Sequence, residues 1–476
     1  MKVLLVNPPT SKNDIRIREG RCQDIDKWSA PFVPLSLAYI AKQIDKLAES
    51  QLIDCGPQGY DMERILKKIG HFKPELVIFT SSTPTAQFDF EWFLPQVKDK
   101  FPKLKMATTG IHASVLTKEI MAEYQDLDFI ISGEPEVTSY QLTKAIKDNL
   151  EYKNILGLAF RDKQGKVIIN SPRPFVENLD ELGIPAWHKV DFSKYLMPIK
   201  NRPFTLISFS RGCPFNCSFC IIHSYYGNEL RKRSPQQIIE EIKLLNDLGV
   251  YDFLLWTEFL TADKDYLDKF LSLIFKEKLE KKISWVTNIR TDYADYETFR
   301  QMKKAGCWQV VFGIEFGTDE MLKRVNKGGQ ASVETSQRAV QAAAKAELVA
   351  DGHFILGYPG ETLKQIDKTI DLALSLPLTF VHFYAASPFP GSQLYQEAVE
   401  KKLFESQDWQ RINLGTASIK TPEFDAKKID SLISQAYRKF YFRPETWFRI
   451  IKIPKNFKEY KSLFVLGMKF LGGIII

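Results

Sequence analysis

Cysteine is scarce in this chain of 476 residues, where it occurs only six times. Six cysteines are too few to build a disulfide scaffold in a protein of this length. Three of them crowd together at positions 213, 217 and 220, while Cys22, Cys55 and Cys307 are scattered. This distribution predicts a reducing cytoplasmic setting with one metal-binding cluster.

Long apolar runs are missing as well. The first residues, MKVLLVNPP, reach two prolines well before the length of a signal peptide's apolar region. No stretch approaches the roughly 20 apolar residues of a membrane span. With 26% charged residues, the composition is that of a soluble globular protein, and the length predicts two or three domains. We therefore expect a cytoplasmic location.

The excess positive charge, +7 overall, lies largely near the C-terminus. Aromatic and basic residues are not interleaved there as a base-stacking surface requires, which predicts no nucleic-acid partner. The segment 444–476 ends in SLFVLGMKFLGGIII, too short an apolar run to cross a bilayer. Two interpretations stay open: a helical cap with solvated lysines, or a peripheral contact with anionic lipids at the inner face of the membrane. The second favours a lipid substrate.

Strand-like and helical patterns alternate from residue 1 to about 150. The apolar runs at 2–6, 51–54, 75–80, 104–108 and 128–131 are separated by amphipathic stretches such as 35–47, 88–100 and 137–148. Such alternation predicts a doubly wound, Rossmann-like α/β domain that binds its ligand at the carboxyl ends of the strands. The loops at those ends, SSTPT, TGIHAS and SGEPE, are rich in small and hydroxyl residues.

Residues 151–200 form a predicted connector that contains a hairpin, LGLAFRDKQGKVII. A second alternating series begins near 204 with six apolar runs: TLISFS, DFLLW, ISWVT, QVVFGIE, HFIL and FVHFYAA. It predicts a partial (β/α)6 TIM-like barrel over 201–400, followed by a helical, basic extension over 401–476. Ser234 and Gln237 predict a capping box, with Pro235 at the first helical position of the helix that follows the cysteines.

The three crowded cysteines directly follow the first strand of the second series. The spacing Cys213-x-x-x-Cys217-x-x-Cys220 suits a loop whose thiolates bind three irons of a 4Fe-4S cluster and leave the fourth iron open. Two alternatives stay open: a buried apolar cysteine group, and a zinc site with His223 as fourth ligand.

The motif FSRGCPFNCSFC and its setting resemble the radical S-adenosylmethionine (SAM) superfamily, over residues 200 to 400. The resemblance implies a cluster on Cys213, Cys217 and Cys220 that binds SAM at its open iron and cleaves it to a 5'-deoxyadenosyl radical. Matching segments at the strand ends imply further SAM contacts, although Thr257 departs from the usual acidic or glycine residue. These candidates are Phe219, Thr257, Glu258, Arg290, Glu315, Arg338, Phe354, Ile355 and Gly357, with Glu361 close by.

The first 150 residues resemble the cobalamin-binding domain fused to one large radical SAM subgroup. The segments that match are VNPP, VPLSLAYIAKQI, TGIHAS and SGEPE, and neither a G-x-G-x-x-G nor a Walker A loop is present. The resemblance implies that Ser81, Ser82, Thr83, Gly110, His112, Gly133 and Glu134 line the cobalamin site. The first loop lacks the D-x-H-x-x-G motif of histidine-ligated cobalamin enzymes, so we expect no histidine on cobalt.

The combined resemblance implies a class B radical SAM C-methyltransferase. It would abstract hydrogen from an unactivated carbon and then transfer a methyl group from methylcobalamin. The same cofactors also allow a radical cyclisation or carbon-skeleton rearrangement, and a zinc- and nucleotide-binding sensor is an alternative of a different class. Expected partners are a small-molecule or lipid substrate and an electron donor such as flavodoxin or ferredoxin. Cys22 is either a buried thiol or part of the active-site mouth.

Overall fold

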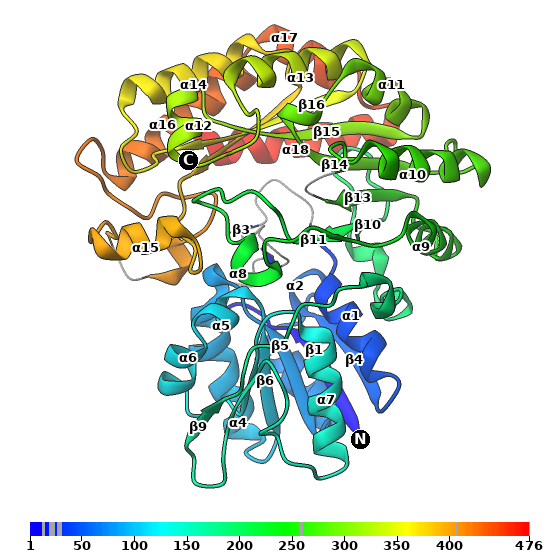
Figure 1. Cartoon of the computed structure of the whole chain (residues 1–476), viewed down its shortest axis with the longest axis vertical. Helices are drawn as coiled ribbons and strands as arrows, with labels where there is room; N and C mark the ends of the chain where they lie inside the picture. The colour runs from blue at the N-terminus through cyan, green and yellow to red at the C-terminus, as the bar shows by residue number, and fades with distance from the viewer. Residues whose placement is uncertain (12–14, 19–23, 26–30, 258–259, 406–407, 476) are drawn as a thin grey trace.

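The protein contains two large β-sheets, which follow one another along the chain and consist mainly of parallel strands (Figure 1). The structure is a computed structural model that describes residues 1–11, 15–18, 24–25, 31–257, 260–405 and 408–475. The first sheet lies at the bottom of Figure 1 and the second at the top, with the C-terminal helices beside the second. Two predicted residues, Cys22 and Glu258, lie outside the described residues.

The first sheet has the order β4-β1-β5-β6-β7-β8-β9, and its first five strands are parallel. This confirms the five predicted strands and a doubly wound domain. The parallel strands are β1 (Lys2–Asn7), β4 (Glu49–Asp54), β5 (Leu76–Thr80), β6 (Lys105–Thr109) and β7 (Phe129–Ile131). Its helical segments are α1 (Leu35–Ile44), α2 (Cys55–Gln58), α3 (Met62–Phe72), the π-helix η2 (Phe88–Phe93), α4 (Leu94–Lys100), α5 (Ile111–Val115), α6 (Thr117–Glu123) and α7 (Pro135–Lys147).

The predicted hairpin forms β8 (Leu158–Arg161) and β9 (Val167–Ile169). It pairs antiparallel with β7 and so completes the first sheet. The first sheet therefore extends to residue 169, into the segment 151–200 that we predicted as a connector. The reason is that β8 offers the edge of β7 a backbone partner that a loose connector would leave unpaired.

The second sheet is an open barrel whose six parallel strands follow chain order. Its strands are β10 (Phe204–Ser208), β13 (Asp252–Trp256), β14 (Ser284–Arg290), β15 (Cys307–Glu315), β16 (Val349–Leu356) and β17 (Phe380–Ala385). Its helices are α8 (Ile222–Tyr226), α9 (Pro235–Asp247), α10 (Lys264–Lys276), α11 (Tyr296–Lys304), α12 (Asp319–Arg324), α13 (Val333–Lys345) and α14 (Leu363–Ser375). The partial barrel predicted from the six apolar runs is confirmed.

Helix α9 begins as predicted, with one difference. The Ser234 side chain accepts a hydrogen bond from the backbone of Gln237, and Pro235 is the first helical residue. The Gln237 side chain does not return to the backbone of Ser234. It donates instead to the carbonyl of Asp180 and accepts from Arg233, because the connector packs against this end of the helix.

The two faces of the barrel sheet differ in chemistry. Phe312, Phe354 and Phe383 point to the face covered by helices, within the main hydrophobic core. The residues that alternate with them line the concave inner face. The inner face carries the polar side chains Asn288, Gln309, Asp351, His353, His382 and Tyr384. The inner face of the barrel is therefore polar.

The open edge of the barrel is covered by helix α16 (Ala426–Tyr441). The Tyr441 hydroxyl accepts from the backbone N–H of Val381, and the Tyr437 hydroxyl accepts from that of Phe383, so these two donors of the edge strand are satisfied. The other C-terminal helices are α15 (Gln393–Glu400), α17 (Pro444–Ile450) and α18 (Phe457–Ile475). In the described part of the chain, no helix combines the length and apolarity needed to cross a bilayer.

Residues 401–425 differ from the helical extension that we predicted. Apart from the short turn η7 (Trp409–Arg411), their described part is irregular. The segment reaches back to the N-terminal domain, where Gln410 donates to Gln87 over 2.8 Å. Contact with loops of another domain favours an irregular backbone here over a regular helix.

A continuous hydrophobic core joins the two domains. It includes Leu5 and Ile78 of the first sheet and Val310 of the barrel. Trp187, in the connector, contributes to the same core and donates its indole N–H to the buried Glu241 of α9. The connector therefore fixes one domain against the other.

Candidate active site

The cysteine loop follows β10 and the short strand β11 (Ser210–Arg211), which pairs with β12 (Arg231–Lys232). Gly212 has φ +83°, and a Cβ there would collide with the carbonyl oxygen of Glu229, so only glycine fits. Cys213, Cys217 and Cys220 are half-buried thiols outside any disulfide. The Cys220 N–H donates to the Cys217 carbonyl over 3.0 Å, which closes a tight turn.

Two observations on the described residues bear on the zinc alternative for these cysteines. Sulfurs bound to one tetrahedral zinc lie about 3.8 Å apart, given Zn–S bonds of about 2.3 Å. Among the described residues, the only group of three metal ligands with all donor atoms within 4.8 Å is a different one, Asp351, His353 and His382. The His223 Nε2 is bonded to the Cys213 carbonyl over 3.1 Å. His223 is thus engaged with the backbone of the cysteine loop.

A second loop, residues 325–329, supports the cysteine loop from below. The Cys217 thiol donates to the Lys327 carbonyl over 3.7 Å, and the Ser218 N–H donates to the Val325 carbonyl over 2.9 Å. Arg290, at the end of β14, donates to the carbonyls of Lys327 and Gly328 over 3.0 and 2.9 Å. Its guanidinium also pairs with Asp292 and lies 3.8 Å from the centre of the Phe215 ring. Arg290 thus holds the loop 325–329, which in turn contacts the cysteine loop.

Glu315 ends β15 in a strained conformation. Its φ is +71°, in the left-handed region that non-glycine residues rarely occupy, and such strain often marks functional positions. The carboxylate is nearly buried and pairs with the Lys327 Nζ over 2.6 Å. Sequence reasoning missed Lys327, although the glycine pair that follows it signals a tight loop.

Several predicted SAM contacts come together near Glu315. Phe219 packs into a small apolar cluster with Ile355, and the Lys327 ammonium lies 6.0 Å from its ring centre. Thr257 is buried at the end of β13, where its hydroxyl lies 3.3 Å from that of Ser210. Phe219 lies within the cysteine loop and Thr257 lies beside the strand that precedes it, and their contact with SAM stays a prediction.

Three other predicted contacts lie elsewhere. Phe354 points to the outer face and stacks on Phe383. Arg338 is exposed on the outside of α13. Gly357 lies against Ile429 of α16. The Phe354 backbone lies beside that of Glu315, but its ring points to the other face of the sheet. Strand alternation and helix faces set such directions, and motif order does not encode them.

Glu361 is a buried carboxyl close to the same end of the barrel. One of its oxygens accepts from the N–H groups of Gly357 and Tyr358, and the other has no hydrogen-bond partner. Burial raises the pKa of Glu361 to about 8. The carboxyl is therefore mostly protonated near neutral pH.

The predicted cobalamin loops gather at the carboxyl ends of the first sheet. Ser81, Ser82 and Thr83 are buried there, and Gly110 approaches them so closely that a Cβ would collide with the Ser81 carbonyl. His112 is 2% exposed; its Nδ1 lies 3.3 Å from the Thr83 hydroxyl. Trp409 covers the His112 ring edge-on at 4.9 Å. Burial lowers the pKa of His112 to about 3, so the imidazole is neutral.

One residue at this edge was missed by sequence reasoning. Arg18 donates to the buried carboxylate of Asp89 over 2.7 Å, to the Thr85 hydroxyl and to two backbone carbonyls. Its local signal, RIREGR, is an ordinary basic stretch. Only the fold shows that this guanidinium occupies the carboxyl end of β5.

Glu134, in the loop after β7, and Glu136, in the first turn of α7, form buried ion pairs with arginines on either side of the cysteine loop. Arg211, two residues before Cys213, pairs with Glu136 over 2.5 Å and with Glu134 over 3.3 Å. Arg231 of β12 pairs with Glu134 over 2.9 Å. Glu134, which we predicted as a cobalamin contact, pairs in the structure with Arg211 and Arg231. These ion pairs join the two domains. We call these four residues the interdomain ion cluster.

A polar group lies deeper in the barrel. The Asp351 carboxylate faces His353 and His382 and accepts from Gln309 over 3.0 Å. Burial by itself raises the pKa of Asp351, but the two histidines and Gln309 outweigh it and hold that pKa below its ordinary value. Asp351 is therefore a carboxylate at neutral pH.

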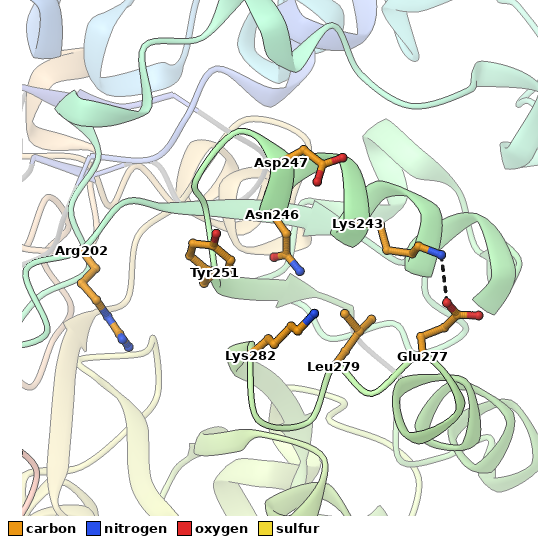
Figure 2. Close-up of a pocket in the computed structure, with 8 residues that line it drawn as sticks. All are labelled: Arg202, Lys243, Asn246, Asp247, Tyr251, Glu277, Leu279 and Lys282. Carbon is orange, nitrogen blue, oxygen red and sulfur yellow. Dashed lines mark hydrogen bonds and ion pairs between the residues drawn. The ribbon is translucent and has the colours of Figure 1, made fainter.

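A surface depression lies at the opposite end of the barrel. Figure 2 shows its lining, which includes Tyr251, Lys282 and the Lys243–Glu277 ion pair at 2.8 Å. These residues precede β13 and β14, at the amino ends of the strands. Barrel enzymes carry their chemistry at the carboxyl ends, so this depression is not the active site.

Comparisons with known proteins agree with the geometry. A family model described as the radical SAM superfamily matches residues 207–373. An uncharacterized methyltransferase of Pyrococcus horikoshii is 31% identical over 446 residues, which are 94% of this chain and 93% of the relative. An anaerobic magnesium-protoporphyrin IX monomethyl ester cyclase of Rubrivivax gelatinosus is 26% identical and covers 93% of this chain and 77% of the relative.

A solved structure resembles both domains. OxsB, described as a cobalamin-dependent SAM radical enzyme with aqua-cobalamin and SAM bound, matches with a TM-score of 0.74 at 17% identity. The match covers 98% of this chain and 70% of that one. It shows that the two proteins share their fold.

An open six-strand barrel with three cysteines after its first strand defines a radical SAM enzyme. This chain belongs to that superfamily and, within it, to the class B, methyltransferase-like family. The cofactors of the family are a 4Fe-4S cluster, SAM and cobalamin.

The interdomain ion cluster predicts a stability effect. Replacing Glu136 by Gln leaves Arg211 undercompensated in a buried site, which costs about 3 kcal/mol of unfolding free energy. We expect a clear drop in melting temperature. Glu297→Gln, which breaks an exposed ion pair with Arg300, serves as the control and leaves it unchanged. Equal melting temperatures for the two variants would contradict this role.

Glu361 predicts a pH effect. The native state keeps a proton that the unfolded chain releases above its ordinary pKa of about 4.3. Stability therefore falls as pH rises from about 5 to about 8, by at most about 1.4 kcal/mol per pH unit. Glu361→Gln removes this contribution, so its stability relative to the parent increases with pH in denaturant titrations. Glu400→Gln, at an exposed position, is the control. If the stability of Glu361→Gln relative to the parent changes with pH no more than that of Glu400→Gln, Glu361 does not titrate this way.

Proposed function

We propose that this protein is a radical C-methyltransferase that replaces a hydrogen on an unactivated carbon with a methyl group. When bound, the cluster and SAM supply the radical that removes the hydrogen, and cobalamin supplies the methyl group. The observation that carries the proposal is the interdomain ion cluster. It joins the loop after β7 to the base of the cysteine loop, so that the carboxyl ends of both sheets meet.

The residues at this junction suit the cofactors. Cys213, Cys217 and Cys220 would hold the cluster. Glu315 would accept from ribose hydroxyls of SAM, with Phe219 and Ile355 beside the adenine. Arg290 would act by holding the loop beneath the cysteines, since its visible hydrogen bonds go to that loop and to Asp292.

The corrin contacts that we propose are Ser81, Ser82, Thr83, Gly110 and Gly133. A Cβ at Gly133 would meet nothing within 4 Å, which leaves room for a ligand. His112 is buried beneath Trp409 and next to Thr83, which supports the proposal that cobalt has no histidine ligand. Without a histidine ligand, bound cobalamin would supply a cobalt that is readily reduced.

The family also contains a second reaction type. The match to the cyclase of Rubrivivax gelatinosus covers 93% of this chain, and the match to the methyltransferase relative covers 94%. Ring closure and methylation both begin with removal of a hydrogen atom. The two reactions differ only after this shared step. Whether the methyl group of SAM appears in the product therefore distinguishes methylation from ring closure.

Isotope labelling provides the test. The reconstituted chain, given SAM labelled in its methyl group, should produce 5'-deoxyadenosine and a product heavier by one labelled methyl. Substituting Cys217 by Ala should abolish both products, since the cluster would lose a ligand. Cys307→Ala, which changes a buried thiol at the start of β15, is the matched control and should retain them.

The result that contradicts methylation is equally specific. Formation of 5'-deoxyadenosine with an unlabelled product would assign cyclisation or rearrangement. Absence of 5'-deoxyadenosine, with zinc in place of iron, would assign the sensor alternative.

The C-terminal helices support a further proposal, peripheral contact with anionic lipid. Phe448 of α17 and Phe457, Phe464 and Met468 of α18 are mostly exposed, among several lysines. Not every basic residue is available: Arg443 and Arg449 donate to the carbonyls of Leu374 and Leu378 near the end of α14. A lipid-facing surface would suit a hydrophobic substrate.

Liposome flotation tests this contact. The full chain should float with phosphatidylglycerol vesicles at low salt and less at high salt, because surface charge attraction is screened. The double substitution Phe457→Ser and Phe464→Ser should reduce the floating fraction severalfold. Ile169→Ser, an exposed apolar position on β9, is the control. Equal flotation of the double variant and the parent would exclude this surface.

A further inference from the structure

Asp351, His353 and His382 form a compact group on the inner face of the barrel. Asp351 and His353 are two residues apart on β16 and therefore share a face. The register of β16 and β17 places His382 directly beside His353. One donor atom from each side chain lies within 4.8 Å of the others.

The distances within this group suit ligands of one ion better than partners in hydrogen bonds. The His382 Nε2 lies 3.5 Å from Asp351 Oδ2, and the His353 Nε2 lies 4.0 Å from Oδ1. Charge-assisted hydrogen bonds are about 2.7–2.9 Å long. Two ligands on one tetrahedral ion, each at about 2.0–2.1 Å, lie about 3.3 Å apart. A small inward movement of both imidazoles would bring their nitrogens to coordination distance.

Asp351 provides a second, independent observation. The residue is 4% exposed, and its Oδ1, which faces His353, has no hydrogen-bond partner. A buried acceptor without a partner is costly and calls for an explanation. Its other oxygen is held by Gln309, as ligating carboxylates are commonly held by a neighbouring donor. A cation at Oδ1 would satisfy the remaining oxygen.

The two histidines are reachable from the barrel interior. Their side chains are 28% and 34% exposed although they lie on the concave face. Tyr384, one position further toward the carboxyl end on the same face, has its ring 5.2 and 5.9 Å from the two imidazoles. Three protein ligands beside an accessible interior leave a fourth position open.

We propose that Asp351, His353 and His382 bind one divalent first-row transition ion, with Zn²⁺ as the reference occupant. Two imidazoles and a carboxylate are a donor set that such ions favour. The open position faces the barrel interior and would take water or an oxygen or nitrogen atom of a small molecule. That such an atom belongs to the substrate rests on the proposed function; binding of the ion does not. This site is separate from the cysteine loop, which follows β10.

Zinc binding by the full chain is the direct test. A parent with Cys213, Cys217 and Cys220 changed to Ser removes competing thiols, and equilibrium dialysis followed by elemental analysis counts the zinc. We expect about one Zn²⁺ per chain, with the affinity reduced at least about 100-fold in Asp351→Asn and His382→Ala. Gln309→Ala, which frees the carboxylate, should weaken binding by about 10-fold. His188→Ala removes an exposed imidazole and should change nothing.

A second readout separates loss of the site from loss of the fold. Co²⁺ in place of Zn²⁺ should give visible absorption of a tetrahedral site, which His382→Ala abolishes while circular dichroism stays native. If His382→Ala does not fold, His382→Gln replaces it. Zinc stoichiometry and affinity unchanged in a folded His382 variant, or no zinc on the parent, would overturn the proposal. Either outcome leaves the methyl-labelling test of the proposed function unaffected.

Discussion

The buried pairing of two glutamates with two arginines between the domains is the interaction on which the site depends. Glu134 and Glu136 follow the last parallel strand of the first sheet, and Arg211 lies two residues before the first cysteine. Charges this deeply buried are tolerated only when they are paired, so their positions are tightly constrained. The pairing sets the distance between the cysteine loop and the proposed corrin loops. A radical formed on one side is useful only if the methyl donor lies within reach on the other.

The barrel keeps its interior polar because its open edge is protected from outside. Tyrosine hydroxyls of α16 satisfy the backbone of β17, so the sheet can stop at six strands without exposing a pairing edge. A closed barrel would fill its centre with apolar side chains. The open one carries polar side chains such as Asp351 and His353 on its inner face. The open edge of the barrel thus goes together with the polar inner face that the proposed chemistry needs.

Much of this architecture follows from the sequence. Period-two and helical patterns predicted the five parallel strands of the first domain and the six of the barrel, and the structure has them. The spacing of Cys213, Cys217 and Cys220 predicts the cluster site. Direction was harder to predict. Phe354 and Arg338 occupy the right strand and helix but face away from the cysteines, since motif order does not specify a face. The ion pairs of Glu134 and the position of Arg18 depend on contacts across 77 and 71 residues, which no local pattern encodes.

We expect one chain to hold both an iron–sulfur cluster and a corrinoid at the junction of its domains. Anaerobic purification with cobalamin supplied, followed by iron, sulfide and cobalt analysis and electron paramagnetic resonance, tests this most directly. We expect about four irons and one cobalt per chain, with a Co(II) spectrum that lacks nitrogen splitting. Zinc in place of iron, no retained corrinoid, or nitrogen splitting that disappears in His112→Ala would contradict the account.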